Sequence, residues 1–324
     1  MTIEHPIQAI RLTRAGGEIG IENGLLTEAI ESDELCWIHL DYSHPAVREW
    51  LDELASLDSI IKSNLTDDDT RPRSFTHQNG IFLSLRGVNL NPGSDPEDMI
   101  AVRLWADERC IITSNRRRLL SLDDIRAGLL GGRGPNSAGG FISLLVELLA
   151  VRAETVIEQL EEQLDLLEDD LNKGDGDIEP RIPLSDLRRQ AIRLRRFFSP
   201  QRQALEHLLN DHPRWLGKGD LLLLRESLNQ FNRYIEELDA VRDMAVVAQE
   251  ELLGKLSEVL NKRMYTLSLV ATIFLPLGFL TGLLGINVGG IPGANSPYGF
   301  LLICLGIGAI VFCLIALLKI KKWF

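Results

Sequence analysis

The sequence carries no formal charge over a long stretch near its end. Charged residues make up 25% of the 324 residues, yet Asp, Glu, Lys and Arg are all missing between Met264 and Leu318. Residues 264–284 and 300–318 within this stretch are apolar runs of roughly the 20 residues that a helix needs to cross a bilayer core. A helix that packs on a soluble core keeps one polar face, and neither run has one. The sequence therefore predicts two transmembrane helices.

Cysteine and basic residues are also scarce. The cysteines are widely spaced and include no C-x-x-C pair, which argues against a disulfide scaffold or a cysteine-rich zinc site. The 34 Lys and Arg residues are outnumbered by 46 Asp and Glu residues, so nucleic acid is not an expected partner. P-loop, nucleophile-elbow and dinucleotide glycine motifs are missing as well. We therefore expect neither an enzyme nor a cofactor.

The charges that flank the two apolar runs predict their orientation. Lys262 and Arg263 precede the first run, the loop 286–299 has no basic residue, and a basic collar follows the second run at Lys319, Lys321 and Lys322. The positive-inside rule then places both termini in the cytoplasm, as in a multi-pass protein of the cell inner membrane. The first residues show no signal-peptide pattern.

Residues 1–140 are predicted to form an α/β or α+β cytoplasmic domain. Short strand-like runs dominate, and the run 99–105 is expected to pair with 110–113 across a turn at 106–109. A helix is predicted over 45–54, with Pro45 in its first turn. The segment 131–140, rich in glycine, is expected to close the domain as a linker.

Residues 141–218 predict an antiparallel pair of long helices that reverses at 174–180. The first helix has an acidic outer face, and the returning helix is rich in arginine. We interpret this opposite charge as structural pairing between the two helices. The alternative interpretation is a gating or ion-storing surface, because so many carboxylates can also hold divalent cations.

A third helix is predicted over 219–285 and continues without a helix breaker into the first apolar run, 264–284. The spacing of its apolar residues is typical of a coiled-coil seam, usable for self-association: Leu224, Leu228, Phe231, Ile235, Leu238 and Ala245. A stalk that becomes the first span suggests several copies around an axis, with this helix lining the centre. The loop 286–299, the second span 300–318 and the tail 319–324 complete the chain.

The tripeptide Gly285-Ile286-Asn287 at the end of the first apolar run, the short loop, the second span and the basic tail resemble the CorA superfamily. The superfamily signature at this place is Gly-Met-Asn, and the Ile variant resembles the zinc transporter (ZntB) branch. This resemblance implies a homopentamer with a cytoplasmic funnel, in which the first span lines the pore and the second faces lipid. It implies divalent cations, above all zinc, as transported substrate rather than cofactor, and leaves coupling to protons open.

In such an assembly, Asn287 would form a ring of neutral oxygens at the outer mouth of the pore, suited to a hydrated divalent ion. Gly285 would let the backbone approach closely or adopt positive φ. The alternative for Asn287 is an ordinary helix C-terminal cap. Helical spacing places further pore-lining candidates on one stripe, at Asn261, Met264, Leu275 and Gly278. The first span has no His, Cys, Asp or Glu, so a zinc ion passing through it is expected to stay hydrated.

Two histidine pairs are weaker candidates for a metal site outside the spans. His39 and His44 are five residues apart, as are His207 and His212, and neither spacing places two ligands on one helix face. Two other functions remain open. One is a magnesium, cobalt or nickel channel of the same superfamily, and the other is a cytoplasmic sensor that uses the two spans only as a membrane anchor.

Overall fold

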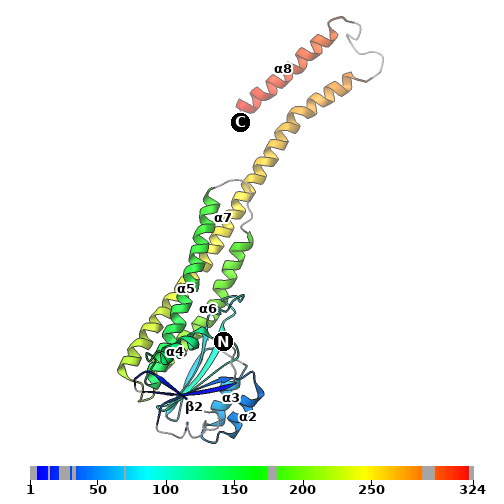
Figure 1. Cartoon of the computed structure of the whole chain (residues 1–324). Helices are drawn as coiled ribbons and strands as arrows, with labels where there is room; N and C mark the ends of the chain where they lie inside the picture. Colours follow the sequence, from blue (N-terminus) through cyan, green and yellow to red (C-terminus); the bar gives the residue numbers. More distant parts are fainter. Residues whose placement is uncertain are drawn as a thin grey trace. The chain divides into compact units, whose positions relative to one another are not determined.

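Figure 1 shows the computed structural model of the chain. It describes residues 6–13, 15–21, 30, 34–68, 71–173, 181–286 and 296–320. The chain divides into two compact units, Met1–Gln249 and Glu250–Phe324. The division falls inside a single helix, α7 (Lys218–Leu284), so the two units share one element of secondary structure.

The first unit is built on a seven-stranded mixed sheet with the order β2-β1-β3-β7-β6-β5-β4. Only the β3–β7 pair is parallel, and the other described pairs are antiparallel. The predicted hairpin is confirmed, because β6 and β7 pair with Trp105 opposite Ile112. The strand bounds are β1 (Ile7–Leu12), β2 (Glu18–Ile21), β3 (Cys36–Asp41), β4 (Arg73–His77), β5 (Gly80–Gly87), β6 (Ile100–Ala106) and β7 (Cys110–Asn115).

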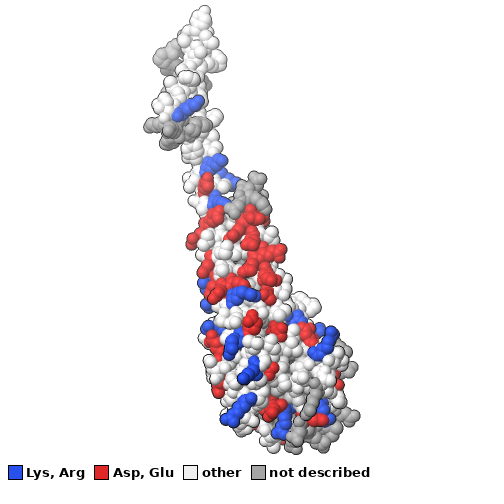
Figure 2. Space-filling model, turned by 90° about the vertical axis from the view of Figure 1, so that its left-hand side faces the viewer, with Lys and Arg blue, Asp and Glu red and all other residues white. Residues whose placement is uncertain are grey.

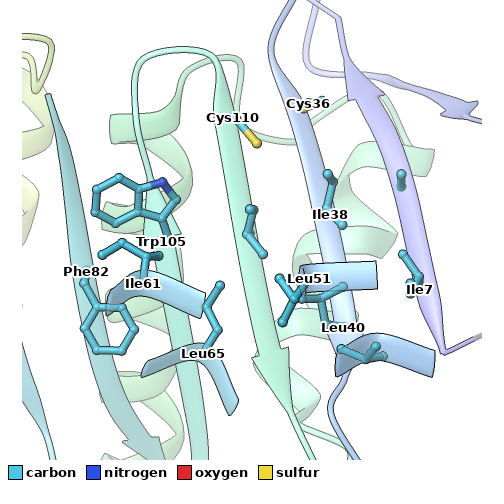
Figure 3. Close-up of a cluster of buried hydrophobic side chains, with 13 residues drawn as sticks. Ile7, Cys36, Ile38, Leu40, Leu51, Ile61, Leu65, Phe82, Trp105 and Cys110 are labelled. Carbon is cyan, nitrogen blue, oxygen red and sulfur yellow. The ribbon is translucent and has the colours of Figure 1, made fainter. Parts of the chain in front are cut away.

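Helices α2 (Pro45–Glu53) and α3 (Ser59–Thr66) cover one face of this sheet. Their buried side chains, such as Leu51 and Leu65, complete an apolar cluster with alternate residues of the strands, as Figure 3 shows. The prediction of a helix over 45–54 is confirmed, and Pro45 lies in its first turn. Proline fits there because the first backbone N–H groups of a helix have no partner inside the helix.

The opposite face of the sheet packs against the longer helices α4 (Leu120–Leu130), α5 (Ala138–Lys173) and α6 (Arg181–Asn210). Helix α5 begins inside the segment 131–140, three residues earlier than predicted. Gly139 in its first turn lies against the Asp220 carboxylate of α7, and a Cβ atom at this position would come within 2.1 Å of Asp220 Oδ2. This glycine therefore permits the close approach of two helix N-termini.

The apolar seam of α7 follows a different course from the predicted one. Its buried residues alternate at spacings of three and four: Leu224, Ser227, Phe231, Tyr234, Leu238, Val241, Ala245 and Ala248. The predicted members Leu228 and Ile235 are only half-buried. The seam is buried within one chain, where Phe231 packs on Phe198 of α6 with ring centroids 5.5 Å apart. The prediction that it serves self-association is therefore wrong.

Charged residues of α5 and of α6 form ion pairs with residues of α7. Arg233 of α7 binds Glu154 of α5 at 2.5 Å, and Arg195 of α6 binds Asp239 of α7 at 2.6 Å. The expected pairing of acidic α5 with basic α6 is thus replaced, at these positions, by pairing of each helix with a third. Figure 2 shows acidic side chains gathered over the long helices of this unit.

The second unit contains the end of α7 and α8 (Gly299–Ile320). Among the described residues, α7 and the segment Gly299–Leu317 are the two helices that are long and apolar enough to cross a membrane, and their most apolar windows have no buried residues. The predicted order is confirmed: a mixed α/β domain, long helices and two apolar C-terminal helices.

Candidate ion-conduction path

The polar side chains of the first apolar helix are partly satisfied by the helix itself. The hydroxyls of Thr266, Thr272 and Thr281 donate to the carbonyls of Lys262, Ser268 and Leu277, four residues earlier, at 2.8 to 2.9 Å. Such bonds allow hydroxyl residues to lie in an apolar helix without unpaired donors. No acidic or basic side chain lies between Met264 and Leu284, so the helix offers an ion only neutral oxygens.

Pro276 lies inside α7, which remains helical on both sides of it. Proline has no backbone N–H, so the carbonyl of Thr272, four residues earlier, receives no hydrogen bond from the helix. Gly278 follows two residues later and brings no side chain to the surface. Pro276 therefore interrupts the regular hydrogen bonding of the helix at this point.

The pore-lining candidates lie on one face of α7. At 100° per residue, Asn261, Met264, Leu275 and Gly278 fall within about 100° of one another around the helix. The same face also contains two hydroxyl residues, Ser268 and Thr272, which were not among the predicted pore-lining residues. These residues are exposed or half-exposed in the single chain, as is the rest of the span, so exposure does not distinguish a pore face from a lipid face.

The predicted filter lies at the end of α7. The backbone N–H of Gly285 donates to the carbonyl of Thr281 at 2.9 Å, so the helical bonding pattern extends one residue beyond Leu284. Gly285 is not among the residues with positive φ, so of its two expected uses, close backbone approach or positive φ, the second is not found. Ile286 follows as an exposed residue, and Asn287 lies outside the described residues. Of the basic collar, Lys319 lies in the last turn of α8, and Lys321 and Lys322 lie outside the described residues.

The candidate histidines have structural contacts of their own. His39 of β3 lies on the side of the sheet that faces α4 and α5, whereas His44 caps α2, which packs on the opposite side. His44 Nδ1 accepts the backbone N–H of Ala46 at 3.2 Å. His207 lies in the last turn of α6, and His212 Nδ1 contacts the carbonyl of Pro213 at 3.2 Å. Within the described ranges, no three His, Cys, Asp or Glu side chains come together as a metal site.

His39 is the most perturbed of these histidines. Burial lowers its pKa from 6.5 to about 4, against the opposing charge of Asp41. Its Nδ1 lies 2.9 Å from Thr113 Oγ1, which also accepts a hydrogen bond from Trp37 Nε1 at 2.8 Å. The imidazole is therefore neutral at pH 7, held in a small polar network on the sheet.

Comparisons with known proteins agree along the whole chain. The sequence profile of the CorA-like Mg²⁺ transporter protein family matches residues 32–322. The chain belongs to this family. Its members are membrane ion transporters rather than enzymes, and membership supports divalent cation transport as the activity.

Two relatives are similar over nearly their full length. A zinc transport protein, ZntB, of Pectobacterium atrosepticum is 34% identical over 97% of this chain and 96% of its own. A divalent cation transporter, CmaX, of Pseudomonas aeruginosa is 36% identical over 92% of this chain and 90% of its own.

Solved structures show the same fold. The full-length structure of a CmaX protein superimposes with a TM-score of 0.85 at 34% identity, and each chain is fully covered. The CorA magnesium transporter from Methanocaldococcus jannaschii, at 16% identity, has a TM-score of 0.81 over the whole of both chains. This second likeness concerns the fold alone.

Proposed function

We propose that the chain transports zinc through a central pore formed by five copies, with Gly285, Ile286 and Asn287 as the selectivity filter. The observation that carries this proposal is the Gly-Ile-Asn tripeptide directly after the first apolar helix, in a chain that belongs to the CorA-like family over nearly its full length. Zinc is supported by the relatives that are named zinc transport proteins, at 30 to 34% identity.

A single apolar helix cannot enclose a path for an ion, so the proposal requires several copies around an axis. The face of α7 that contains Asn261, Ser268, Thr272 and Gly278 would line the path, because it combines amide and hydroxyl oxygens with a glycine. Met264 and Leu275 on the same face would be apolar constrictions, which close a pore to ions by excluding water.

The chemistry of this face favours an ion that keeps its water shell. Direct zinc binding uses thiolate, imidazole or carboxylate, and the first span has none of these side chains. Amide oxygens at Asn287 would accept hydrogen bonds from the bound water without trapping the ion. If protons are coupled to transport, their binding groups lie outside the spans, because neither span contains a carboxylate or an imidazole.

The distribution of basic residues supports an orientation with both termini on the cytoplasmic side of the inner membrane. Lys262 and Arg263 precede the first span, Lys319 ends the second, and the connecting loop has no basic residue. In this orientation Asn287 faces the outside, and the sheet-containing unit is in the cytoplasm.

A magnesium, cobalt or nickel channel is the second candidate. It is favoured by the absence of soft ligands from the first span, because neutral oxygens and water suit magnesium well.

Uptake of zinc and of magnesium into proteoliposomes, each with and without a pH gradient, distinguishes the zinc transporter from the magnesium channel. Preferential zinc flux supports the proposal, and preferential magnesium flux overturns the choice of ion. No flux of either ion, from protein that is monomeric or dimeric in detergent, would favour the anchored sensor.

The filter assignment has its own test. Asn287→Ala is expected to change flux or selectivity at least several-fold while the mass of the assembly in detergent stays the same. Asn295→Ala, the same substitution in the same loop, is the matched control and should leave selectivity unchanged. Wild-type flux and selectivity in a fully assembled Asn287→Ala protein would remove Asn287 from the filter.

A further inference from the structure

A row of polar side chains crosses four strands of the sheet on the face that α2 and α3 cover. The register places Arg73 of β4 opposite Ser84 of β5, Ser84 opposite Arg103 of β6, and Arg103 opposite Ser114 of β7. Residues directly opposite each other in a sheet point to the same side. Phe82 and Trp105, which Figure 3 labels, form the neighbouring pair on the same face, two residues along each strand from Ser84 and Arg103.

Arg103 is a buried cation without a carboxylate partner among the described residues. Its side chain is among the largest in the fully buried set, with 1% of the residue exposed. Its Nη2 donates to the backbone oxygen of Asp67 and, at 3.3 Å, to the hydroxyl of Tyr42, and its guanidinium lies 4.3 Å from the centre of the Tyr42 ring. These groups are neutral. A buried charge without a counter-ion is costly, so this position calls for an anion.

Three polar atoms of the row have no hydrogen-bond partner although they are shielded from solvent. They are Arg103 Nη1, Ser84 Oγ and Arg73 Nε, on three consecutive register partners. Ser84 lies between the two arginines and is only 2% exposed. Both guanidinium atoms are obligatory donors, and the serine hydroxyl can also donate. Donors on all three residues therefore lack an acceptor.

The rest of the row explains where an acceptor would enter. Ser114 Oγ donates to the carbonyl of Leu65 at 2.6 Å, so that end of the row is closed by α3. At the other end, the side chain of Arg73 is 39% exposed, and it binds Asn64 Oδ1 at 2.7 Å and the Asp67 carboxylate at 3.3 Å. In the part of the chain that the structure describes, the carboxylate of Asp67 pairs with Arg73, and the row is open to solvent on that side.

Further positive charge lies nearby. Burial lowers the pKa of Arg86, and the positive charges of Arg117 and Arg103 lower it further, so both of these guanidiniums lie close enough to Arg86 to repel its charge. Arg117 pairs with Asp98. Among these arginines, Arg73 pairs with Asp67 and Arg117 pairs with Asp98, whereas Arg103 binds only neutral groups.

We propose that Arg73, Ser84 and Arg103 form a binding site for a small oxyanion of the phosphate type. Guanidinium groups bind oxyanions through paired N–H donors, and a serine hydroxyl between them supplies a third donor. The ligand enters from the Arg73 side and neutralises Arg103. This site lies on the sheet and is independent of the ion path that is proposed above.

The first test is direct binding of inorganic phosphate to the full-length protein in detergent, measured by equilibrium dialysis with labelled phosphate. We expect one saturable site per chain. Ser84→Ala is expected to weaken binding about threefold to tenfold, which is the effect of one lost hydrogen bond. Arg103→Met is expected to abolish it. Ser121→Ala is the matched control, because Ser121 Oγ is also buried without a partner but lies in α4.

Non-specific effects of phosphate do not imitate this binding, because phosphate stabilises most proteins through exclusion from their surface, and exclusion gives no saturable site. That effect rises without saturation and is equal in all variants. Phosphate binding that is absent, or that is equal in wild type and in Ser84→Ala, overturns the proposal. A phosphomonoester in place of inorganic phosphate tests the source of the ligand. Tighter binding of the monoester identifies a phosphorylated metabolite, and tighter binding of the free ion identifies phosphate itself.

A second variant keeps the proposal falsifiable if Arg103→Met does not fold. Ser84→Asp places a carboxylate between the two guanidiniums, where the anion is proposed to bind. The melting temperature should rise in the absence of phosphate, and the response to phosphate should disappear. Ser121→Asp, a carboxylate at an equally buried serine, should lower the melting temperature. If Ser84→Asp lowers it as much as Ser121→Asp does, the row has no need of an anion, and the proposal is wrong.

Discussion

The two parts of α7 arrange their apolar residues in different ways. Between Lys218 and Gln249 the buried positions follow a regular spacing of three and four, and the outer side is mostly charged or polar, with a few exposed apolar residues such as Leu222 and Val247. Between Met264 and Leu284 apolar residues occur all around the helix, and no position is buried in the single chain. The first pattern is that of a helix with protein on one side and water on the other. The second is that of a helix that is apolar on every side, as membrane spans are.

The difference shows that one helix can be specified by two separate rules. In the first part the position of each side chain around the helix decides its environment, so a substitution matters only on the seam. In the second part apolar residues occur on every side, as a membrane span requires, so the position of a residue around the helix carries less information. Substitutions matched across the two parts of α7 test this difference.

The largest effect is expected at the seam. Phe231→Ala removes a fully buried ring that packs on Phe198 and Tyr234, and it should lower the free energy of unfolding of the first unit by about 3 to 5 kcal/mol. Phe274→Ala in the second part, where the residue is 66% exposed, should leave that unfolding unchanged. Urea denaturation in detergent, followed by tryptophan fluorescence, measures both. Equal effects of the two variants would contradict the distinction between the two parts.

The first unit should also respond to pH through His39. Its pKa is lowered from 6.5 to about 4 by burial, so between these values the unfolded chain binds a proton that the folded chain does not. Stability is therefore fully present above pH 6.5 and is lost as pH falls towards 4, by at most about 3 kcal/mol. The measurement is the difference between wild type and His39→Gln in unfolding free energy from pH 7 to pH 4. Parallel curves for the two proteins would refute this assignment.

The junction of α5 and α7 is expected to be sensitive to a single methyl group. Gly139→Ala would place its Cβ atom against Asp220 Oδ2, and it should destabilise the first unit by about 1 to 3 kcal/mol. Gly219→Ala is the control, because a Cβ atom there meets nothing within 4 Å. It should be neutral or slightly stabilising, since alanine favours helix over glycine. Thermal unfolding of both variants decides the matter, and a neutral Gly139→Ala would show that the two helices can move apart.

The smallest effect is expected at the charged outer side of α7. Glu154→Gln removes the ion pair with Arg233, whose side chain is 53% exposed, and it should cost between about 0.2 and 1 kcal/mol. The loss should shrink further at high salt, because exposed charges are screened. The measurement is urea denaturation at two salt concentrations. A loss above 2 kcal/mol that persists at high salt would mean that charge, and not the apolar seam, holds α5 to α7.

Some features could be predicted because they depend on local composition. Two apolar helices follow from the missing charges between Met264 and Leu318, and the β6–β7 hairpin follows from two apolar runs separated by a short turn. The course of the seam could be predicted only in part. Ser227 and Tyr234 are buried members, but their polar groups hide them from a search for apolar residues, which selected Leu228 and Ile235 instead.

The partners of the charged residues could not be predicted from neighbouring helices along the chain. Glu154 and Arg195 bind residues of α7 because three helices pack around one seam, so the nearest opposite charge belongs to the third helix. The register of the sheet strands could not be predicted from the sequence either. Arg73, Ser84 and Arg103 are unremarkable in the sequence, and only strand pairing brings them into one row.

Local sequence specifies the two apolar spans, the alternation of strands and helices in the first unit, and the Gly-Ile-Asn tripeptide that follows the first span. These depend on the composition of continuous segments, since transfer from water to lipid and the turn preferences of short segments are local properties. Tertiary packing sets which residues of α7 form the seam, which charges pair, and which polar side chains meet beneath α3. Those outcomes depend on distances between segments that are far apart along the chain, and packing sets these distances.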